Sequence, residues 1–239
     1  MAPSKMTTRS CSACRYVEAE GSSRPRSSGD GVGTQTGYRW PPRRPEQAPV
    51  ACRDVAPRIY TKRGDDGTTG LLYGGRVRKD SWRIDLNGVV DEAQAAIGVA
   101  RAQTPERSEV NDRLTTLARE LYVLMAEVAT APENRSKLQA GSSLVTPDMV
   151  TALEVGIDDL LARFDMPSDF TVPGENSVAA ALDLARTIVR RAERLAVAEP
   201  VGEGSFVVSY LNRLSDLLWA MARWQEGPEH VLSKDATGN

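Results

Sequence analysis

The chain contains few of the residues that build metal sites and disulfides. Its 239 residues include three cysteines, Cys11, Cys14 and Cys52, and a single histidine, His230. Cys11 and Cys14 form a CxxC that could supply half of a zinc site, but no second CxxC follows and one histidine does not complete the usual ligand set. We therefore favour free thiols, as in a protein of a reducing compartment, over a zinc site.

Long hydrophobic runs and an excess of one charge are absent as well. No apolar stretch approaches the roughly 20 residues that span a bilayer, and the chain does not begin with an apolar segment of signal-peptide length. The formal net charge of -2 gives no general attraction to nucleic acid. We expect a soluble, cytoplasmic protein that binds neither membranes nor nucleic acid and uses its basic residues for a small phosphate-bearing ligand.

Composition divides the chain into three parts. Residues 1–56 are rich in Ser, Pro, Gly and Arg and bury too little apolar surface to offset their chain entropy, so we expect a disordered tail. The tail could be a transit peptide, a disordered arm, or sequence translated upstream of the true start; its prolines and acidic residues disfavour a transit helix. We predict a compact domain over residues 57–227 and a flexible C-terminus over residues 228–239.

Most of the compact domain has the hydrophobic spacing of amphipathic helices. Apolar residues recur at steps of three and four, which predicts a helix over residues 82–102 and another over about 106–131. Three more helices follow, and the first of these has Thr146 as its N-cap and Pro147 at its first position. Because no alternating strand pattern is visible, we predict an all-α fold, a bundle of five helices.

The first of two charged motifs is TKRGDDGTTG, residues 61–70. Its glycines allow a tight backbone, and its lysine and threonines suit phosphate oxygens. It is not a Walker A loop, because the lysine precedes the glycines. Taken alone, the motif is better explained as a plain turn.

The second charged motif is RRAER, residues 190–194, within the predicted fourth helix. Together with Arg186 it places three arginines and Glu193 near one helix face. Spacing alone leaves two interpretations open, an anion-binding face or a solvated face with a pair between Arg190 and Glu193. Arg213 and Asp216 could likewise pair along the fifth helix.

Six ordered blocks of sequence resemble the PduO-type ATP:cob(I)alamin adenosyltransferases. They lie between Arg58 and Gly227 and comprise IYTK with GDDGTT (59–69), RV with KD (76–80), GVVDE with IG (88–98), Phe170 with VPG (172–174), Arg186 with RRAER (190–194), and YLNRLSD (210–216). Asn87, Gln94 and the pair Glu175-Asn176 depart from the family pattern. The resemblance implies a five-helix bundle that forms a homotrimer, with ATP and a corrinoid side by side between subunits.

The resemblance also implies a role for particular residues. Those implied to bind ATP are Thr61, Lys62, Gly64, Gly67, Thr68, Thr69, Lys79, Arg190, Glu193, Arg194 and Asn212. Those implied to act in catalysis are Arg190, Arg194 and Phe170. Phe170 and Asp216 would contact cobalamin, Glu193 would help to hold the metal of the nucleotide, and Asp91 would pair with an arginine across the subunit interface.

The implied activity is transfer of the 5′-deoxyadenosyl group of ATP to cob(I)alamin, which gives adenosylcobalamin and triphosphate. Mg²⁺ would accompany ATP, and the partners would include a reductase and an adenosylcobalamin-dependent mutase. An alternative is a corrinoid carrier that delivers adenosylcobalamin without making it, but Lys62, Arg190, Arg194 and Asn212 argue against a protein without catalysis. A purely structural bundle would have no use for the glycine-rich motif.

Overall fold

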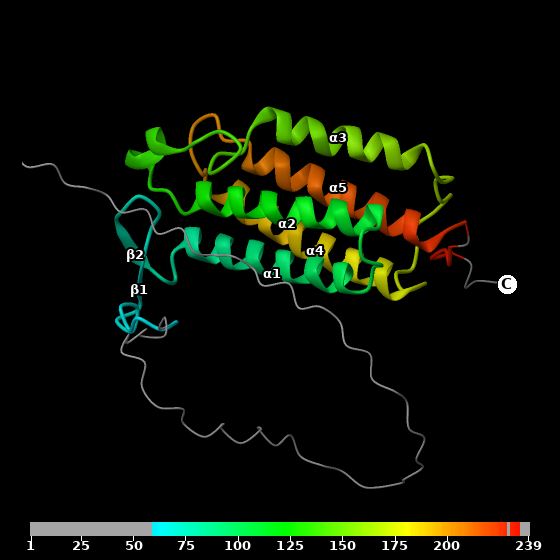
Figure 1. Ribbon diagram of the computed structural model, residues 1–239, viewed down its shortest axis with the longest axis horizontal. Helices are drawn as coiled ribbons and strands as arrows, with labels where there is room; N and C mark the ends of the chain where they lie inside the picture. Colours follow the sequence, from blue (N-terminus) through cyan, green and yellow to red (C-terminus); the bar gives the residue numbers. More distant parts are fainter. Residues whose placement is uncertain (1–58, 229, 235–239) are drawn as a thin grey trace, which may run out of the picture. The chain divides into compact units, whose positions relative to one another are not determined.

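The computed structural model describes residues 59–228 and 230–234. The predicted tail with its three cysteines, and the last five residues of the predicted C-terminal segment, lie outside these residues. The described chain forms five α-helices, one short 3-10 helix and a two-stranded sheet (Figure 1). The predicted helical bundle is therefore confirmed, but the fold is not purely helical.

Three of the helices begin at a side chain that caps a free backbone N–H group. The helices are α1 (Trp82–Ala102), α2 (Glu109–Val128), η1 (Pro132–Lys137), α3 (Pro147–Leu161), α4 (Ser177–Ala198) and α5 (Val207–Glu226). The Ser108 side chain accepts a hydrogen bond from the Asn111 amide, so α2 begins three residues later than the periodicity predicted. Thr146 caps α3 as expected, and Asn176 caps α4.

The sheet corrects the prediction that the chain has no strands. Strands β1 (Thr68–Gly70) and β2 (Arg76–Arg78) pair antiparallel, with Thr69 opposite Val77. Three residues are too few for an alternating pattern to stand out, so periodicity did not reveal them. Strand β1 forms the last three residues of the glycine-rich motif, and the hairpin lies beyond the N-terminal end of α1 (Figure 1).

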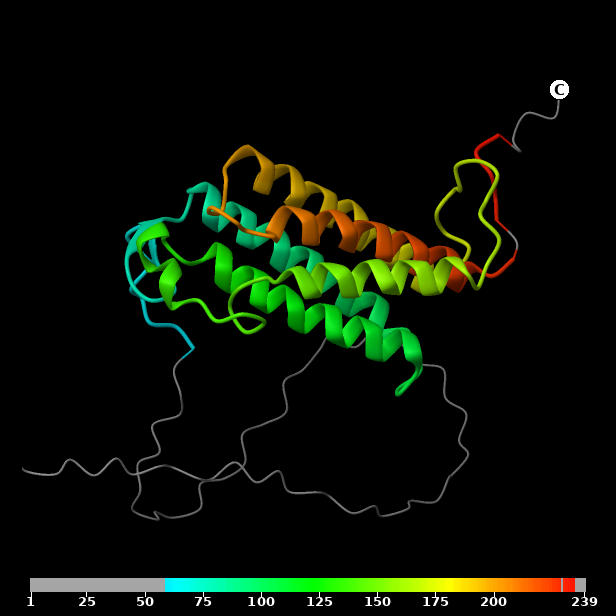
Figure 2. The same cartoon turned by 90° about the horizontal axis from the view of Figure 1, so that it is seen from above.

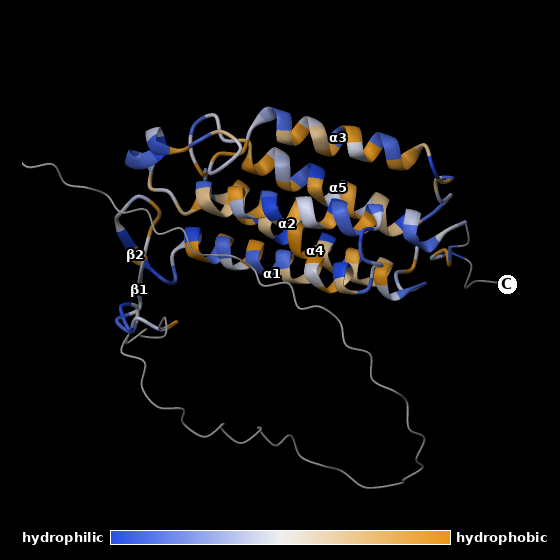
Figure 3. Cartoon of the chain, in the orientation of Figure 1, coloured by the Kyte–Doolittle hydropathy of each residue, from blue (hydrophilic) through white to orange (hydrophobic). Residues whose placement is uncertain are grey.

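Helices α4 and α5 form the middle of the bundle. Helix α4 packs against α1 and α5, α2 packs against α1, and α3 packs against α5 (Figures 1 and 2). Each of the five α-helices carries both hydrophobic and hydrophilic residues along its length (Figure 3). The fully buried core side chains include Leu86, Ile97, Leu114, Leu121, Leu160, Leu182, Leu211, Leu214 and Leu218. In the described part of the chain, no helix is both long enough and apolar enough to cross a membrane.

A buried carboxylate holds three loops together at the hairpin end of the bundle. The side chain of Glu127 is fully buried and accepts hydrogen bonds from Arg135 Nη2 at 3.0 Å, Val145 N at 2.8 Å and Ser205 Oγ at 2.7 Å. These donors belong to η1 and to the segments before α3 and α5. The end of α2 is in turn joined to the hairpin segment, because Leu72 N donates to Ala129 O.

A half-buried acid gives the bundle a predictable dependence on pH. Tyr210 Oη donates to Glu120 Oε2 at 2.7 Å, yet burial raises the pKa of Glu120 above its ordinary value of 4.5. The folded state therefore holds this proton more tightly than the unfolded state, and its stability falls as pH rises from the unfolded to the folded pKa.

We therefore expect Glu120→Gln, which keeps an acceptor for Tyr210, to be more stable than the unaltered protein by an amount that grows with pH. Urea unfolding from about pH 4 to about pH 8 measures this difference. The matched control is Glu199→Gln at the exposed end of α4, which should give a constant difference. A constant difference for Glu120→Gln as well would contradict the prediction.

Candidate functional site

The glycine-rich loop is held by its own side chains. Asp66 Oδ1 accepts hydrogen bonds from Thr68 N at 2.9 Å and Thr68 Oγ1 at 2.8 Å. Arg76 Nη2 donates to Thr68 Oγ1 at 2.6 Å and to Arg63 O at 2.7 Å. The backbone hydrogen bond from Thr68 is the main cause of a lowered Asp66 pKa. Asp66 and Arg76 therefore serve to shape the loop.

Two glycines of the loop are required by its geometry. Gly67 has φ +79°, a conformation that L side chains rarely adopt. A Cβ on Gly64 would lie 3.0 Å from Lys79 Nζ, so glycine leaves room for that ammonium group across the loop. Lys62 is exposed, and neither lysine ammonium has a hydrogen-bond or ion-pair partner within residues 59–228 and 230–234. The loop therefore presents two free cations, as an anion-binding loop requires.

Two arginines of the α4 face have no partner among the described residues, whereas Arg186 pairs with Asp183. Arg190 and Arg194 are exposed, and neither forms a hydrogen bond or ion pair in the part of the chain that the structure describes. Glu193 instead accepts a hydrogen bond from Asn212 Nδ2 of α5, at 2.8 Å. The alternative of a solvated face with an Arg190–Glu193 pair is therefore wrong about the pair. Arg191 is bound to Glu92 of α1.

Helix α5 contributes a second correction. Arg213 Nε donates to Glu154 Oε1 of α3 at 2.9 Å, and Arg213 Nη1 donates to Asn212 Oδ1. Arg213 thus ties α5 to α3 and orients Asn212, and it does not pair with Asp216. Asp216 is exposed and lines a groove of about 380 Å³. Asp91 is exposed on α1 without a partner among the described residues.

Phe170 lies on the connection between α3 and α4. Its side chain is 82% exposed and lines a cavity of about 540 Å³ together with Trp219, Arg186 and Arg223. Trp219 also lines the groove that contains Asp216. The two residues predicted to contact cobalamin therefore border two hollows that share one tryptophan in their lining. Neither Trp219 nor Arg223 was predicted as a site residue.

Within one chain the predicted site residues fall into two groups. Figure 1 shows the hairpin and the α3–α4 connection at opposite ends of the bundle. The C-terminal end of α4, which carries the arginine face, lies at the hairpin end (Figure 2). One chain alone therefore does not bring the glycine-rich loop to Phe170.

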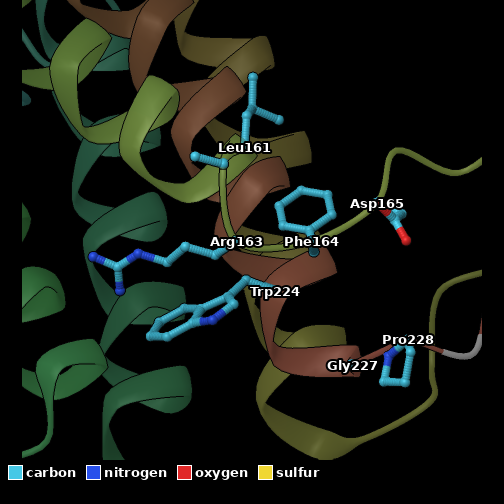
Figure 4. Close-up of a pocket in the computed structure, with 8 residues that line it drawn as sticks. Leu161, Arg163, Phe164, Asp165, Trp224, Gly227 and Pro228 are labelled. Atoms are coloured by element: carbon cyan, nitrogen blue, oxygen red, sulfur yellow. The ribbon is translucent and has the colours of Figure 1, made fainter.

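A further hollow contains none of the predicted residues. It has a volume of about 620 Å³ and is lined by residues that include Arg163, Phe164 and Trp224 (Figure 4). The Arg163 guanidinium lies 5.5 Å from the centre of the Trp224 ring and pairs with Glu109 and Asp159. Because its charge is already neutralised by two carboxylates, this hollow has no free cation for a phosphate.

Comparisons with known proteins point to one family. The sequence profile of the family described as cobalamin adenosyltransferase matches residues 59–225. The corrinoid adenosyltransferase of Citrobacter freundii is 37% identical over 171 residues, which cover 71% of this chain and 95% of the relative. The corrinoid adenosyltransferase of Bacillus subtilis (strain 168) is 38% identical, with 70% of this chain and 85% of the relative covered.

A solved structure agrees with the sequence relatives. It is a variant PduO-type ATP:corrinoid adenosyltransferase from Lactobacillus reuteri, complexed with cobalamin and ATP. The match has a TM-score of 0.66 and 28% sequence identity, and covers 74% of this chain and 99% of that chain. With the profile match over most of the chain, these findings show that this protein belongs to the cobalamin adenosyltransferase family, as its six sequence blocks predicted.

Proposed function

We propose that this protein transfers the 5′-deoxyadenosyl group of ATP to cob(I)alamin and releases triphosphate. The observation that carries the proposal is a pair of exposed arginines on α4, Arg190 and Arg194, that have no partner among the described residues. They lie beside a Glu193–Asn212 hydrogen bond that joins α4 to α5. Free guanidinium groups on a rigid helix are suited to a polyphosphate. A carrier without catalysis would not need them.

The glycine-rich loop is the natural second half of the triphosphate site. Its residues Thr61, Lys62, Gly64, Gly67, Thr68 and Thr69 supply backbone N–H groups and hydroxyls, and Lys79 adds a cation from the strand side of the loop. Lys62 and Lys79 have no competing partner among the described residues. The loop would close over the phosphates from one side while Arg190 and Arg194 hold them from the other.

A magnesium ion fits this site as a companion of the nucleotide. No cluster of three or more His, Cys, Asp or Glu side chains in the described residues is placed to hold a metal, whereas Mg²⁺ commonly takes one or two carboxylates together with substrate phosphates. Glu193, fixed by Asn212, would be that carboxylate. The ion would neutralise part of the phosphate charge.

The reaction needs alignment more than acid–base chemistry. The electron pair of cob(I)alamin attacks C5′ of ATP, the cobalt–carbon bond forms, the C5′–O bond breaks, and its electrons leave with triphosphate, so Co(I) becomes Co(III). No proton moves in this step. The protein's contribution is to hold cobalt, carbon and leaving oxygen in line and to stabilise the departing charge with Arg190, Arg194 and the lysines.

Phe170 would act on the corrinoid. An exposed aromatic ring that lines a cavity can pack against the lower face of the corrin and displace the axial base, which makes the cobalt easier to reduce. Asp216 would support the same substrate from the neighbouring groove.

The site requires more than one copy of the chain in this proposal. The hairpin and the α3–α4 connection, which contains Phe170, lie at opposite ends of the bundle (Figure 1), and Asp91 is an exposed acid without a partner in the described chain. A homotrimer would bring the loop of one subunit to the cavity of the next, with Asp91 paired to an arginine across the interface. Sedimentation at micromolar concentration tests this assembly directly.

The decisive experiment mixes the purified protein with chemically reduced cobalamin and Mg-ATP without oxygen. The visible spectrum should show loss of cob(I)alamin and formation of adenosylcobalamin in proportion to the ATP consumed. Binding of both ligands without turnover would favour a corrinoid carrier instead. A downstream mutase or a reductase is then sought by adding each enzyme to the same reaction.

Deletion of residues 1–54 is expected to leave the rate of adenosylation unchanged within about twofold, because neither the six sequence blocks nor the family match reaches them. The same anaerobic assay on the shortened and full-length chains measures the effect. A large loss with an unchanged melting temperature would show that the N-terminal part takes part in the reaction.

A further inference from the structure

The position of Phe170 depends on how its loop is anchored. A side chain that is 82% exposed gains little orientation from packing, so the backbone around it must set where the ring lies. The connection from Leu161 to Ser177 contains no helix and neither of the two strands of the sheet. Contacts from outside the α3–α4 connection must therefore fix the backbone around Phe170.

A segment near the C-terminus provides one anchor. Residues 231–233 run antiparallel to the loop, with Thr171 and Leu232 bridged. Val172 N donates to Val231 O at 2.8 Å, and Ser233 N donates to Phe170 O at 2.8 Å. The carbonyl of Phe170 is thus hydrogen-bonded to the segment over residues 231–233.

One buried arginine holds both the Phe170 loop and the segment over residues 231–233 to the bundle. Arg223 of α5 is 1% exposed and its Nη1 donates to Thr171 Oγ1 in the loop. Its Nη2 donates to Glu226 Oε1 at 2.7 Å, and Glu226 Oε2 lies 3.0 Å from His230 Nδ1, where the C-terminal segment begins. The Arg223 guanidinium therefore contacts the Phe170 loop directly, and it contacts the C-terminal segment through Glu226.

Arg223 is also tied to the helix that carries the arginine face. Its Nη2 donates to Asp183 Oδ2 of α4 at 2.6 Å, and Asp183 Oδ1 accepts from Arg186 Nε at 2.8 Å. Arg223 Nε is buried without a hydrogen-bond partner among the described residues. A buried guanidinium with an unused donor is a destabilising way to fill a core position, so the residue is better explained by the groups that it holds.

We propose that Arg223 is a positioning residue that fixes Phe170 against the corrinoid through Thr171 and the Glu226–His230 contact. The proposal rests on the proposed function. It implies that the anchored loop is needed to displace the axial base of cob(II)alamin, and that it is dispensable once cob(I)alamin, which no longer holds that base tightly, is supplied.

Thr171→Val is the sharpest test, because it removes the hydroxyl that Arg223 reaches and leaves the buried ion pairs intact. From cob(II)alamin with a reducing system and saturating Mg-ATP, we expect about a tenfold lower rate, the effect of one lost hydrogen bond to a charged group. From cob(I)alamin the rate should stay within about twofold. Thr171→Ser, which keeps the hydroxyl, should restore the rate. Thr151→Val, at an exposed position on α3, is the matched control.

Electron paramagnetic resonance of cob(II)alamin bound with ATP gives a second readout, since a nitrogen ligand on the lower face splits the cobalt signal. Thr171→Val should lower the fraction of cob(II)alamin without that ligand, and Thr171→Ser should not. Arg223→Lys should lower this fraction further if its melting temperature shows that the protein is folded. If Arg223→Lys does not fold, the comparison of Thr171→Val with Thr171→Ser tests the proposal.

The possible results separate this inference from the proposed function. An unaltered protein that does not adenosylate cob(I)alamin removes the proposed function and this inference with it. An active protein in which Thr171→Val slows both routes equally, or leaves the paramagnetic signal unchanged, overturns the positioning role alone.

Discussion

Arg190→Ala is expected to lower kcat by about a thousandfold or more, because one exposed guanidinium carries much of the charge stabilisation of the leaving triphosphate. Arg190 has no hydrogen-bond or ion-pair partner in the described chain, so its loss removes no interaction that supports the fold. The melting temperature should therefore shift by no more than about 2 °C. The anaerobic conversion of cob(I)alamin with saturating Mg-ATP measures the effect.

A matched pair of variants isolates the role of Arg190. Arg119→Ala removes another exposed arginine, from α2, and should leave kcat unchanged. Arg190→Lys keeps the charge but loses the planar fork, and should retain part of the activity. Turnover that survives in Arg190→Ala at the level of Arg119→Ala would place Arg190 outside the site.

Helices were predictable from sequence because each buries one stripe of residues. The start of α1 at Trp82 and the Thr146 cap of α3 follow from local pattern alone. The hairpin was not predictable, since each strand has three residues and Thr68 and Arg76 are joined by hydrogen bonds across the turn. Asn176, part of a departure from the family pattern, proves to be the cap of α4 and to bind Gln225 O.

The site was only partly predictable, and for a different reason. Charged residues at helical spacing indicated an arginine face, but spacing did not tell whether Glu193 pairs with Arg190 or with Asn212 of the next helix. Likewise Arg223 lies within an apolar stretch of α5, and its partners Thr171 and Asp183 are far from it in sequence. Contacts between distant segments decide such roles, and periodicity carries no information about them.

The second large effect is expected at Phe170. Phe170→Ala should slow adenosylation from cob(II)alamin with a reducing system by about a hundredfold, because an alanine leaves the axial base in place and the cobalt hard to reduce. The change should leave ATP affinity intact, since the groups proposed to hold the triphosphate are the glycine-rich loop, Lys79 and the α4 arginines, whereas the 82% exposed Phe170 side chain is proposed to contact the corrinoid. From cob(I)alamin the loss should be far smaller.

The comparison of the two starting states is what gives the Phe170 experiment its meaning. Tyr122→Ala removes another exposed aromatic side chain, from α2, and should change neither rate. If Phe170→Ala slowed both routes by the same factor, the ring would serve to bind the corrinoid as a whole. A loss confined to the cob(II)alamin route, larger than that of Thr171→Val, would instead show that the ring acts on the cobalt and that its loop serves to aim it.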